Sequence, residues 1–370
     1  MAEHNLIKAT RLSPPIDTSL PYDETKIAGK TVVITGGAQG LGSEFAKRWA
    51  SLGASIMVGD IDDKVGEAFV SELREKYPAG SHHYFHCDVT SWDSQTAFFK
   101  GAARASPHGG IDVVVANAGV NIPKANAQFE SPEPRPDDPD APPRPDLRIL
   151  EVNVTAAMLT AHLALFWLPR NGPNRLNLHR NSGAATADDP ARDRCLVLIG
   201  SAAGVFPFGG QALYTCSKHA ITGIFRALRG TAWASGVRVN MLCPYFVIGS
   251  RMFPPVAEAA MLAGSAGGAR LEDVVDAATR FAADDSIVGR ALFVGPNMHI
   301  EGQAPGAGVE DGLVDERAIW DCYAEDYKDS EPFVWRFIRA MNAVERVKGW
   351  IGFWREFIGV ILRMFVGRGG

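Results

Sequence analysis

Two side chains four residues apart carry the clearest chemistry in the sequence, Tyr214 and Lys218. In a helix, residues at i and i+4 share a face, so the Lys218 ammonium would lie beside the Tyr214 phenol. A free phenol ionises at about pH 10, and a neighbouring cation favours the ionised form, which is the form that can act as a base. The spacing alone is also typical of a surface helix that carries one aromatic residue.

A serine close to this pair favours the catalytic interpretation. Ser201 lies thirteen residues before Tyr214 and directly after the apolar run 195–200, which is typical of a buried strand. A hydroxyl at a strand end and a Tyr/Lys pair on the next helix form a proton-transfer site. We therefore expect these three side chains to act together.

A glycine-rich turn near the start of the chain predicts a phosphate site. Strand-like residues 30–34 lead into Thr-Gly-Gly-Ala-Gln-Gly-Leu-Gly at 35–42, and a helix-like run follows at 43–50. In this order, glycines let the backbone approach a pyrophosphate, and the helix N-terminus offers unpaired N–H groups. The expected dinucleotide-binding residues of this turn are Gly36, Gly40, Leu41 and Gly42.

The choice of cofactor is predicted by the acidic residue that ends the second strand-like run. Asp60 follows residues 54–59 and can accept hydrogen bonds from both ribose hydroxyls while repelling a 2′-phosphate. The glycine turn contains no arginine that would bind such a phosphate. These features favour NAD over NADP, whereas a role as an N-cap or turn residue is the alternative for Asp60.

Together the motifs resemble the short-chain dehydrogenase/reductase family, in particular its 15-hydroxyprostaglandin dehydrogenase-like branch. The resemblance covers about residues 30–302. The likeness to the family rests on the glycine turn, Asp88 after a third strand, Asn117-Ala118-Gly119 after a fourth, Asn153, Ser201 and the Tyr214/Lys218 pair. The likeness to the branch rests on the stretches 211–219, 236–244 and 283–289.

The resemblance implies a role for each of these residues. Tyr214 would be the general acid/base, Lys218 would also hold the nicotinamide ribose, and Asn153 would hold a water. Ser201 and Gln211 would bind the substrate oxygen. The further cofactor-binding residues that it implies are Asp88, Val89, Asn117 and Val247.

Two positions depart from the pattern of the family. Tyr245 stands where a glycine usually follows the proline after the sixth strand, and Gly249 with Ser250 replaces a usual threonine. Tyr245 is therefore expected in the substrate wall together with Phe206 and Phe208, which lie between Ser201 and Tyr214. Apolar residues at 252–256 and 261–262 resemble a substrate lid. These residues predict a lipophilic substrate, and ordinary loop anchoring is the alternative.

The order of the elements predicts one α/β domain. Helix-like runs separate strand-like runs, which predicts a doubly wound parallel sheet of the Rossmann type. The expected strands are 31–35, 55–59, 83–87, 111–116, 195–200, 237–242 and 290–295.

The chain is expected to divide into three parts. These are a strap at 1–29, the dinucleotide-binding domain at 30–302 with surface inserts at 121–147 and 170–194, and a helical extension at 303–370. The first insert is Pro-rich, too much so for a helix or strand, and a partner-binding role is its alternative.

Composition excludes several other classes of protein. The net charge of the 370 residues is −5, which argues against a nucleic-acid partner. The five cysteines are scattered without metal-ligand spacing, which is typical of a reducing compartment. His82, His83 and His86 fit a strand with surface histidines better than a metal site. The N-terminus has no apolar signal segment, so we expect a cytoplasmic protein without a resident metal.

The C-terminal tail has an unbroken apolar stripe. Its apolar residues recur every three or four positions from Phe337 to Phe365, and arginines accompany them. This pattern is typical of an amphipathic helix in the plane of a membrane surface. Packing against the chain's own domain or a sister subunit in a homodimer or homotetramer is the alternative.

The sequence therefore predicts an NAD-dependent oxidoreductase that interconverts a secondary alcohol and a ketone on a lipophilic small molecule. The first alternative is a tailoring ketoreductase or dehydrogenase of a polycyclic secondary metabolite, which would use the same residues. A non-catalytic, NAD-binding, membrane-associated scaffold is a more distant one. The complete set of Ser201, Tyr214, Lys218 and Asn153 argues against the scaffold.

Overall fold

The structure is a computed structural model that describes residues 12–172, 192–206, 208–248, 267–299 and 316–322. In the tail it also describes the single helical positions 340, 343, 347, 350, 351, 354 and 358. Gly249, Ser250 and the expected lid at 252–262 lie outside the described residues, as do most of the second insert and most of the tail.

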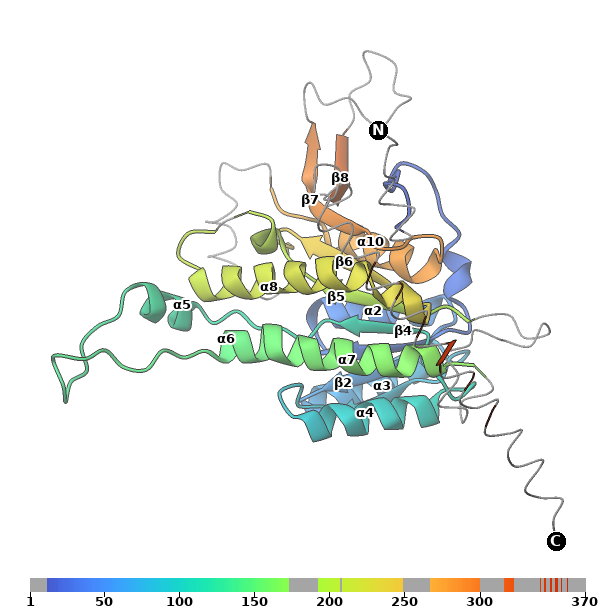
Figure 1. Cartoon of the computed structure of the whole chain (residues 1–370), viewed down its shortest axis with the longest axis horizontal. Helices are drawn as coiled ribbons and strands as arrows, with labels where there is room; N and C mark the ends of the chain where they lie inside the picture. Colours follow the sequence, from blue (N-terminus) through green and yellow to red (C-terminus); the bar gives the residue numbers. More distant parts are fainter. Residues whose placement is uncertain are drawn as a thin grey trace, which may run out of the picture.

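A single eight-stranded sheet forms the middle layer of the molecule (Figure 1). All seven strands predicted from the sequence are present, and β7 is followed by an antiparallel β8. The strands lie in the order β3-β2-β1-β4-β5-β6-β7-β8. Their bounds are β1 Thr31–Thr35, β2 Ser55–Asp60, β3 His83–His86, β4 Val113–Ala116, β5 Cys195–Ile199, β6 Arg238–Pro244, β7 Ala291–His299 and β8 Glu316–Cys322. The predicted doubly wound fold is confirmed.

The central strands β1, β4, β5 and β6 are buried along their whole length because helices cover both faces of the sheet. Along β1, Val32 and Ile34 belong to the core on one face, and Val33 belongs to the core on the other. Residues on a strand alternate between faces, so a parallel strand with two covered faces needs a continuous apolar run. That requirement is why continuous apolar runs in the sequence located these strands.

Helices α2 (Gly40–Ser51), α3 (Asp63–Lys76) and α10 (Leu271–Ala283) pack on one face. Helices α4 (Trp92–Ala105), α7 (Ala157–Trp167) and α8 (Ala212–Arg229) pack on the other. Trp49 ties the first group together, because its indole N–H donates to the Thr279 hydroxyl at 2.9 Å and joins α2 to α10. The short elements are η1 Glu24–Ile27, α5 Pro123–Glu130, α6 Arg148–Leu150, η2 Glu151–Ala156, η3 Leu168–Arg170, η4 Ala202–Gly204 and η5 Ala232–Ser235.

The strand β8 was not predicted, since it lies within the segment 303–370 that we expected to be helical. The N-terminal strap fastens it to the sheet: the buried Arg290 guanidinium donates to both Asp321 carboxylate oxygens at 3.0 Å and to the Ser13 carbonyl at 3.2 Å. Asp321 also accepts the Ile16 N–H at 2.8 Å. The backbone of the strap is therefore bound to both members of the buried Arg290–Asp321 ion pair, which joins β8 to the start of β7.

The first insert also differs from expectation, because it contains the helix α5. Pro123 occupies the first turn of α5, where a missing N–H leaves no hydrogen bond unmade. Beyond α5, the chain from 131 to 147 is without helix or strand, as the prolines predicted, and extends away from the sheet (Figure 1).

Buried ion pairs line the amino edge of the sheet, which we define by Lys30, Asp112, Asp193 and Arg238 at the starts of four neighbouring strands. The Asp193 carboxylate accepts from Lys30 Nζ at 2.8 Å and from Arg238 Nε and Nη2 at 2.8 and 2.6 Å. Burial by itself would raise the pKa of Asp193, but the hydrogen bonds and charge of Arg238 and Lys30 hold this pKa below its ordinary value.

Asp112 is held at the same edge by a second set of donors. Arg192 binds both of its oxygens at 2.8 Å, the ring nitrogen Nε2 of His108 lies 2.8 Å from Oδ2, and the Thr31 N–H donates at 2.8 Å. Burial opposes ionisation of Asp112, yet these partners keep its pKa below the ordinary value. Arg192 and Asp193 belong to the insert 170–194, so the end of that insert is part of the core rather than a surface excursion.

Candidate functional site

The glycine turn between β1 and α2 has no room for side chains at two of its positions. Gly36 has φ +61°, and a Cβ built there would lie 2.8 Å from the Ala118 Cα. A Cβ at Gly42 would lie 2.5 Å from the Gly36 carbonyl oxygen. Only glycine fits both positions, because the turn packs tightly on the end of β4.

Gly40 shows the open side of the same turn. Its φ is +56°, and no atom lies within 4 Å of the position that a Cβ would take. The turn thus presents bare backbone to open space at the N-terminus of α2, where a phosphate would meet the unpaired N–H groups. This is the cradle that a dinucleotide requires, so the residues present fit the cofactor. Leu41 packs partly against the core below.

Asp60 lies beside the turn, at the end of β2. Its Oδ2 accepts the Ala38 N–H at 3.0 Å, and its Oδ1 accepts the Asp62 N–H at 3.2 Å. One carboxylate is therefore held against the glycine turn by the backbone, with further acceptor capacity for ribose hydroxyls.

Asn117 at the end of β4 braces this turn. Its amide Nδ2 donates to the carbonyls of Thr35 at 3.0 Å and Gly36 at 2.8 Å. Both amide hydrogens are thus used within the protein. On the neighbouring loop after β3, the Asp88 carboxylate accepts from the Thr90 N–H at 2.9 Å, and Val89 is buried.

Ser201 follows the last residue of β5 by two positions and caps η4. Its Oγ accepts the Ala203 N–H at 3.2 Å, which leaves its hydroxyl hydrogen to donate elsewhere. The end of η4 packs closely on α8, since a Cβ on Gly204 would lie 2.7 Å from the Lys218 carbonyl oxygen. Ser201 and the Tyr214/Lys218 pair therefore belong to adjoining elements.

Tyr214 and Lys218 lie on the first two turns of α8, as predicted. The Lys218 side chain is buried; its Nζ lies 5.7 Å from the centre of the Tyr214 ring and donates to the Ile199 carbonyl at 3.1 Å. Ile199 is the last residue of β5, so this bond draws Lys218 to the strand end that precedes Ser201. The structure thus brings the three predicted catalytic side chains together.

Asn153 lies in a π-helical turn, η2, between α6 and α7. Its Oδ1 accepts the Val120 N–H at 2.7 Å, and its Nδ2 donates to the Val120 carbonyl at 2.9 Å and to Ser217 Oγ at 3.1 Å. Such single π turns are frequent at functional sites. Through Ser217, Asn153 is linked to α8 next to Lys218.

Aromatic rings line the region beyond Ser201. Phe208 and Tyr245 lie 6.4 Å apart between ring centres, and both Tyr245 and Phe206 contact Phe293, at 6.4 and 5.8 Å. Phe293 was missed from the sequence, where it is one apolar residue within a strand. The register could have revealed it, because Phe293 pairs with Cys243 of β6, two residues before Tyr245. Val247 is buried on the same connection.

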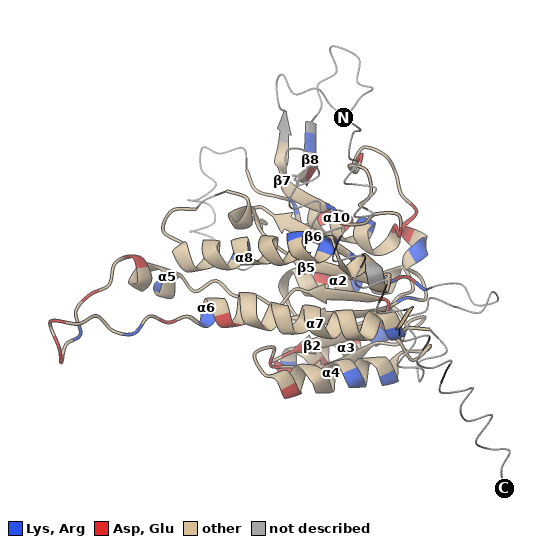
Figure 2. Ribbon diagram, viewed as in Figure 1, with Lys and Arg blue, Asp and Glu red and all other residues tan. Residues whose placement is uncertain are grey.

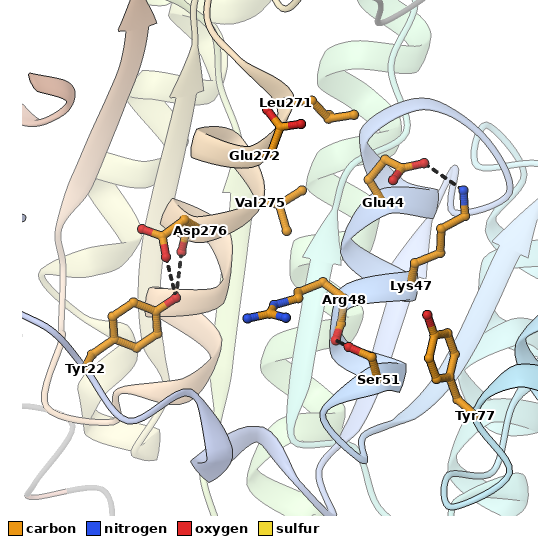
Figure 3. A pocket seen from close by; sticks show the side chains of 10 residues that line it. All are labelled: Tyr22, Glu44, Lys47, Arg48, Ser51, Tyr77, Leu271, Glu272, Val275 and Asp276. Carbon is orange, nitrogen blue, oxygen red and sulfur yellow. Dashed lines mark hydrogen bonds and ion pairs between the residues drawn. The ribbon is translucent and has the colours of Figure 1, made fainter. Parts of the chain in front are cut away.

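A cavity of about 460 Å³ lies apart from these residues, on the face covered by α2 and α10 (Figure 3). Some of its polar groups are paired with one another: Tyr22 Oη donates to Asp276 at 2.8 Å, and Lys47 binds Glu44 at 2.8 Å. Since α8 lies on the opposite face, this cavity is separate from the Tyr214 group. The lining residues are Tyr22, Glu44, Lys47, Arg48, Ser51, Tyr77, Leu271, Glu272, Val275 and Asp276.

His82 departs from the expected surface position. The ring is buried, with Nδ1 accepting the Ile56 N–H at 3.3 Å and Nε2 within 2.9 Å of the Tyr77 carbonyl. Burial lowers the pKa of His82. Within the described ranges, no group of three or more His, Cys, Asp or Glu side chains could hold a metal ion.

The chain is similar to known proteins in its family pattern, its sequence and its structure. Residues 30–172 and 193–260 match the family model described as short chain dehydrogenase. The 5′-hydroxyaverantin dehydrogenase of Emericella nidulans is 34% identical over 293 residues, covering 76% of this chain and 88% of the relative. The enzyme of the same name from Dothistroma septosporum is 32% identical, covering 74% and 87%.

Other relatives and solved structures agree with this match. The (+)-borneol dehydrogenase 1 of Salvia officinalis is 26% identical, covering 60% of this chain and 72% of the relative. A solved structure of xylitol dehydrogenase with NAD⁺ bound has a TM-score of 0.56 at 22% identity, covering 73% of this chain and 99% of that protein. At that identity, the structural likeness shows the fold alone.

Proposed function

Because this chain belongs to the short-chain dehydrogenase family and is an alcohol dehydrogenase/reductase, we propose that it interconverts a secondary alcohol and a ketone on a lipophilic small molecule with NAD. The observation that carries the proposal is the placement of Tyr214 and Lys218 on α8 beside Ser201 at the end of β5. The glycine turn, with Asp60 beside it, lies at the same carboxyl edge of the sheet.

NAD supplies the hydride acceptor for the oxidation. The residues that would hold it are the glycine turn with Gly36, Gly40, Leu41 and Gly42, then Asp60, Asp88, Val89, Asn117 and Val247, together with Tyr214 and Lys218. Asp60 supports NAD over NADP because its carboxylate would repel a 2′-phosphate. For Asn117, the bonds to the turn support a bracing role, in which it fixes the shape of the cradle.

The protein's own task in the reaction is to move one proton. In the oxidative direction, Tyr214 Oη takes the proton of the substrate hydroxyl, while the Ser201 hydroxyl and the Gln211 amide hold the substrate oxygen. Lys218 places its ammonium on the same side of α8 as the phenol, with Nζ 5.7 Å from the centre of the Tyr214 ring. Asn153, bound to Ser217 next to Lys218, supports the return of the proton to water on that side.

The proposal is tested by supplying secondary alcohols with NAD, and ketones with NADH, and by following the absorbance of the reduced nicotinamide. Tyr214→Phe serves as the matched control, since it removes one oxygen. Turnover by the wild type that disappears in the variant supports the proposal. Absence of turnover across a panel that includes large apolar alcohols would contradict it.

The aromatic residues Phe206, Phe208, Tyr245 and Phe293 support an apolar substrate, because their rings contact one another on segments that follow Ser201 and β6. The relatives named for 5′-hydroxyaverantin favour the tailoring of a polycyclic secondary metabolite as the more specific version of this proposal. If it is right, Phe293→Ala should raise the KM for a polycyclic alcohol at least several-fold more than the KM for a short aliphatic alcohol.

For the tail we infer contact with a membrane surface by a cytoplasmic protein. Supporting this, the described helical positions Val347, Trp350, Ile351, Trp354 and Ile358 are 49–66% exposed and lie at i, i+3, i+4, i+7 and i+11, on one side of a helix. Elsewhere in the described chain, only Arg148–Arg170 is a helix long and apolar enough to cross a membrane, and its inner face packs in the core.

Truncation after Pro332 tests the inference about the tail. It should leave the dehydrogenase folded and abolish sedimentation with anionic vesicles. A full-length protein that ignores vesicles, together with a truncated protein that aggregates, would instead favour packing of the tail on protein.

We also propose that the protein forms a homodimer or homotetramer. Few residues of α7 and α8 are Lys, Arg, Asp or Glu (Figure 2), and α7 contains none of them while exposing Met158 and Phe166. Analytical ultracentrifugation of the wild type and of Phe166→Glu is the test, and a wild type that is monomeric at micromolar concentration would contradict the proposal.

A further inference from the structure

The first turn of α8, which carries Tyr214, lacks a capping side chain of its own. The first N–H groups of any helix lack partners within the helix, and the N-cap side chain normally accepts one of them. Here the N-cap residue is Gln211, whose side chain makes no capping bond. Another part of the chain must therefore satisfy these groups.

The helix α5 supplies two acceptors to this turn. Glu130 Oε1 accepts the Ala212 N–H at 2.7 Å, and Asn126 Oδ1 accepts the Tyr214 N–H at 3.1 Å. Asn126 is fully buried at 0% exposure, so water does not compete for its bond. The two N–H groups that are capped belong to the catalytic tyrosine itself and to the residue two positions before it.

A second chain of amides runs from α5 to Gln211. Asn126 Nδ2 donates to Asn121 Oδ1 at 3.0 Å, and Asn121 Nδ2 donates to Gln211 Oε1 at 2.8 Å. Because Asn121 occupies the Gln211 oxygen, the NH₂ of Gln211 is left as the group that can donate. An NH₂ group suits an oxygen that accepts, which is what a ketone or an alcohol oxygen presents.

Apolar contacts fix the same two helices. Ala125 of α5, Leu213 of α8 and Ile149 form a small buried cluster, and Tyr214 packs against it. This cluster holds α5 against α8 in a defined orientation, so the amide bonds are made by a fixed surface rather than by a free loop.

We propose that α5 positions the reactive end of α8, with Asn126 setting the place of Tyr214 and Asn121 setting the direction of the Gln211 amide. Neither asparagine touches the reacting atoms; both are positioning residues. Because α5 caps the helix, the side chain of Gln211 is not needed as the N-cap acceptor and can bind the substrate oxygen. The inference about catalysis rests on the proposed function, whereas the capping itself does not.

Kinetics separate the two arms of the proposal. Asn126→Ala should lower kcat about 10- to 100-fold, the scale of a small displacement of a reacting group, with little change in NADH binding measured by fluorescence. Asn126→Asp keeps the oxygen that accepts from the Tyr214 N–H and should recover most of the lost kcat.

Asn121→Ala should raise the KM of the substrate about tenfold and leave kcat within about twofold, because it frees only the Gln211 amide. Glu133→Ala, in the exposed chain just after α5, is the control.

Hydrogen exchange tests the capping without any substrate. In Asn126→Ala and Glu130→Ala, exchange at 212–215 should be about tenfold faster, while the rest of α8 keeps its protection and Glu130→Gln behaves as wild type. Unchanged exchange at 212–215 in both alanine variants overturns the proposal. So does a fall in melting temperature with kcat of the folded fraction unaltered. A wild type that turns over no alcohol or ketone would refute the proposed function, and the exchange data would then still decide for or against capping by α5.

Discussion

The two edges of the sheet are held together by different kinds of bond. At the amino edge, the carboxylates of Asp112 and Asp193 are buried and surrounded by Arg192, Arg238 and Lys30. At the carboxyl edge, where Tyr214 lies, neutral amides such as Asn117, Asn126 and Asn153 make most of the bonds, and the carboxylates of Asp60 and Glu130 accept only from backbone N–H groups.

The difference follows from what each edge must do. Charges buried in pairs fix the starts of four strands, but they are costly to disturb and would alter the titration of any neighbouring group. Amides hold atoms in place without adding a net charge. A site that must move one proton near neutral pH is thus better framed by amides, with Lys218 as the one buried cation beside the phenol.

The largest effect is expected from breaking the amino edge. Asp193→Ala leaves Arg238 buried without its carboxylate and should lower the free energy of unfolding by about 3–5 kcal/mol, as for other broken buried pairs. Urea unfolding at neutral pH measures it. Activity per folded molecule should hardly change.

An exposed ion pair provides the matched control. Asp137 pairs with Arg135 on the surface of the first insert, where both side chains are well exposed. Asp137→Ala should leave the free energy of unfolding nearly unchanged, because an exposed ion pair contributes little to stability. Equal losses for Asp137→Ala and Asp193→Ala would show that the amino edge is not specially stabilising.

A change at the carboxyl edge should instead lower activity and leave stability nearly unchanged. Tyr214→Phe removes only the proton carrier, so turnover should fall about 10²–10³-fold while the free energy of unfolding stays nearly constant. Steady-state kinetics and urea unfolding of one preparation measure both quantities. A variant that keeps a tenth or more of wild-type turnover would remove Tyr214 from the role of acid/base.

Acid should act first on the amino edge. The pKa values of Asp112 and Asp193 are lower in the folded than in the unfolded chain, so the folded state binds fewer protons in this range. Their stabilisation is complete above the unfolded value of about 3.9 and is lost as the pH falls through the folded values below it. The free energy of unfolding should therefore fall below about pH 4 more steeply in the wild type than in Asp193→Asn. Parallel curves for the two proteins would contradict this account.

The smallest effect concerns cofactor choice at the carboxyl edge. The wild type should prefer NAD over NADP in kcat/KM, and Asp60→Ala should narrow that preference about tenfold, since it removes both the repulsion of a 2′-phosphate and the acceptor for the ribose. The ratio of the two kcat/KM values is the measurement. Equal use of the two cofactors by the wild type would remove this role from Asp60.

The sequence predicted what local patterns encode. The strands were found because burial on both faces requires runs such as Val32-Val33-Ile34, and the Tyr214/Lys218 pair was found because its spacing is that of one helical turn. The strand β8 was missed because Glu316, Arg317 and Asp321 interrupt its apolar residues, so it has no clear period. Its partner for Asp321, Arg290, is 31 positions away.

The brace on α8 was missed for a related reason. Asn126 and Tyr214 are 88 residues apart, and an asparagine in a Pro-rich insert resembles any other loop residue until the fold brings it to the start of α8. The same holds for Asp193, whose partners Lys30 and Arg238 are 163 and 45 positions away. Long-range polar contacts depend on the assembled sheet, so no local sequence pattern predicts them.

The ion pair of Arg290 with Asp321 also has a consequence for the timing of folding during synthesis. The hydrogen bonds that the strap at 13–18 makes to the domain involve residues 280–290 and 319–321, so nearly the whole chain must leave the ribosome before all of them can form. Contacts between residues so far apart form slowly, because a long loop must close first. The first segment to be translated is therefore among the last to be fixed. A nascent chain stopped before Arg290 should leave its strap open to protease, and one released after Cys322 should protect it.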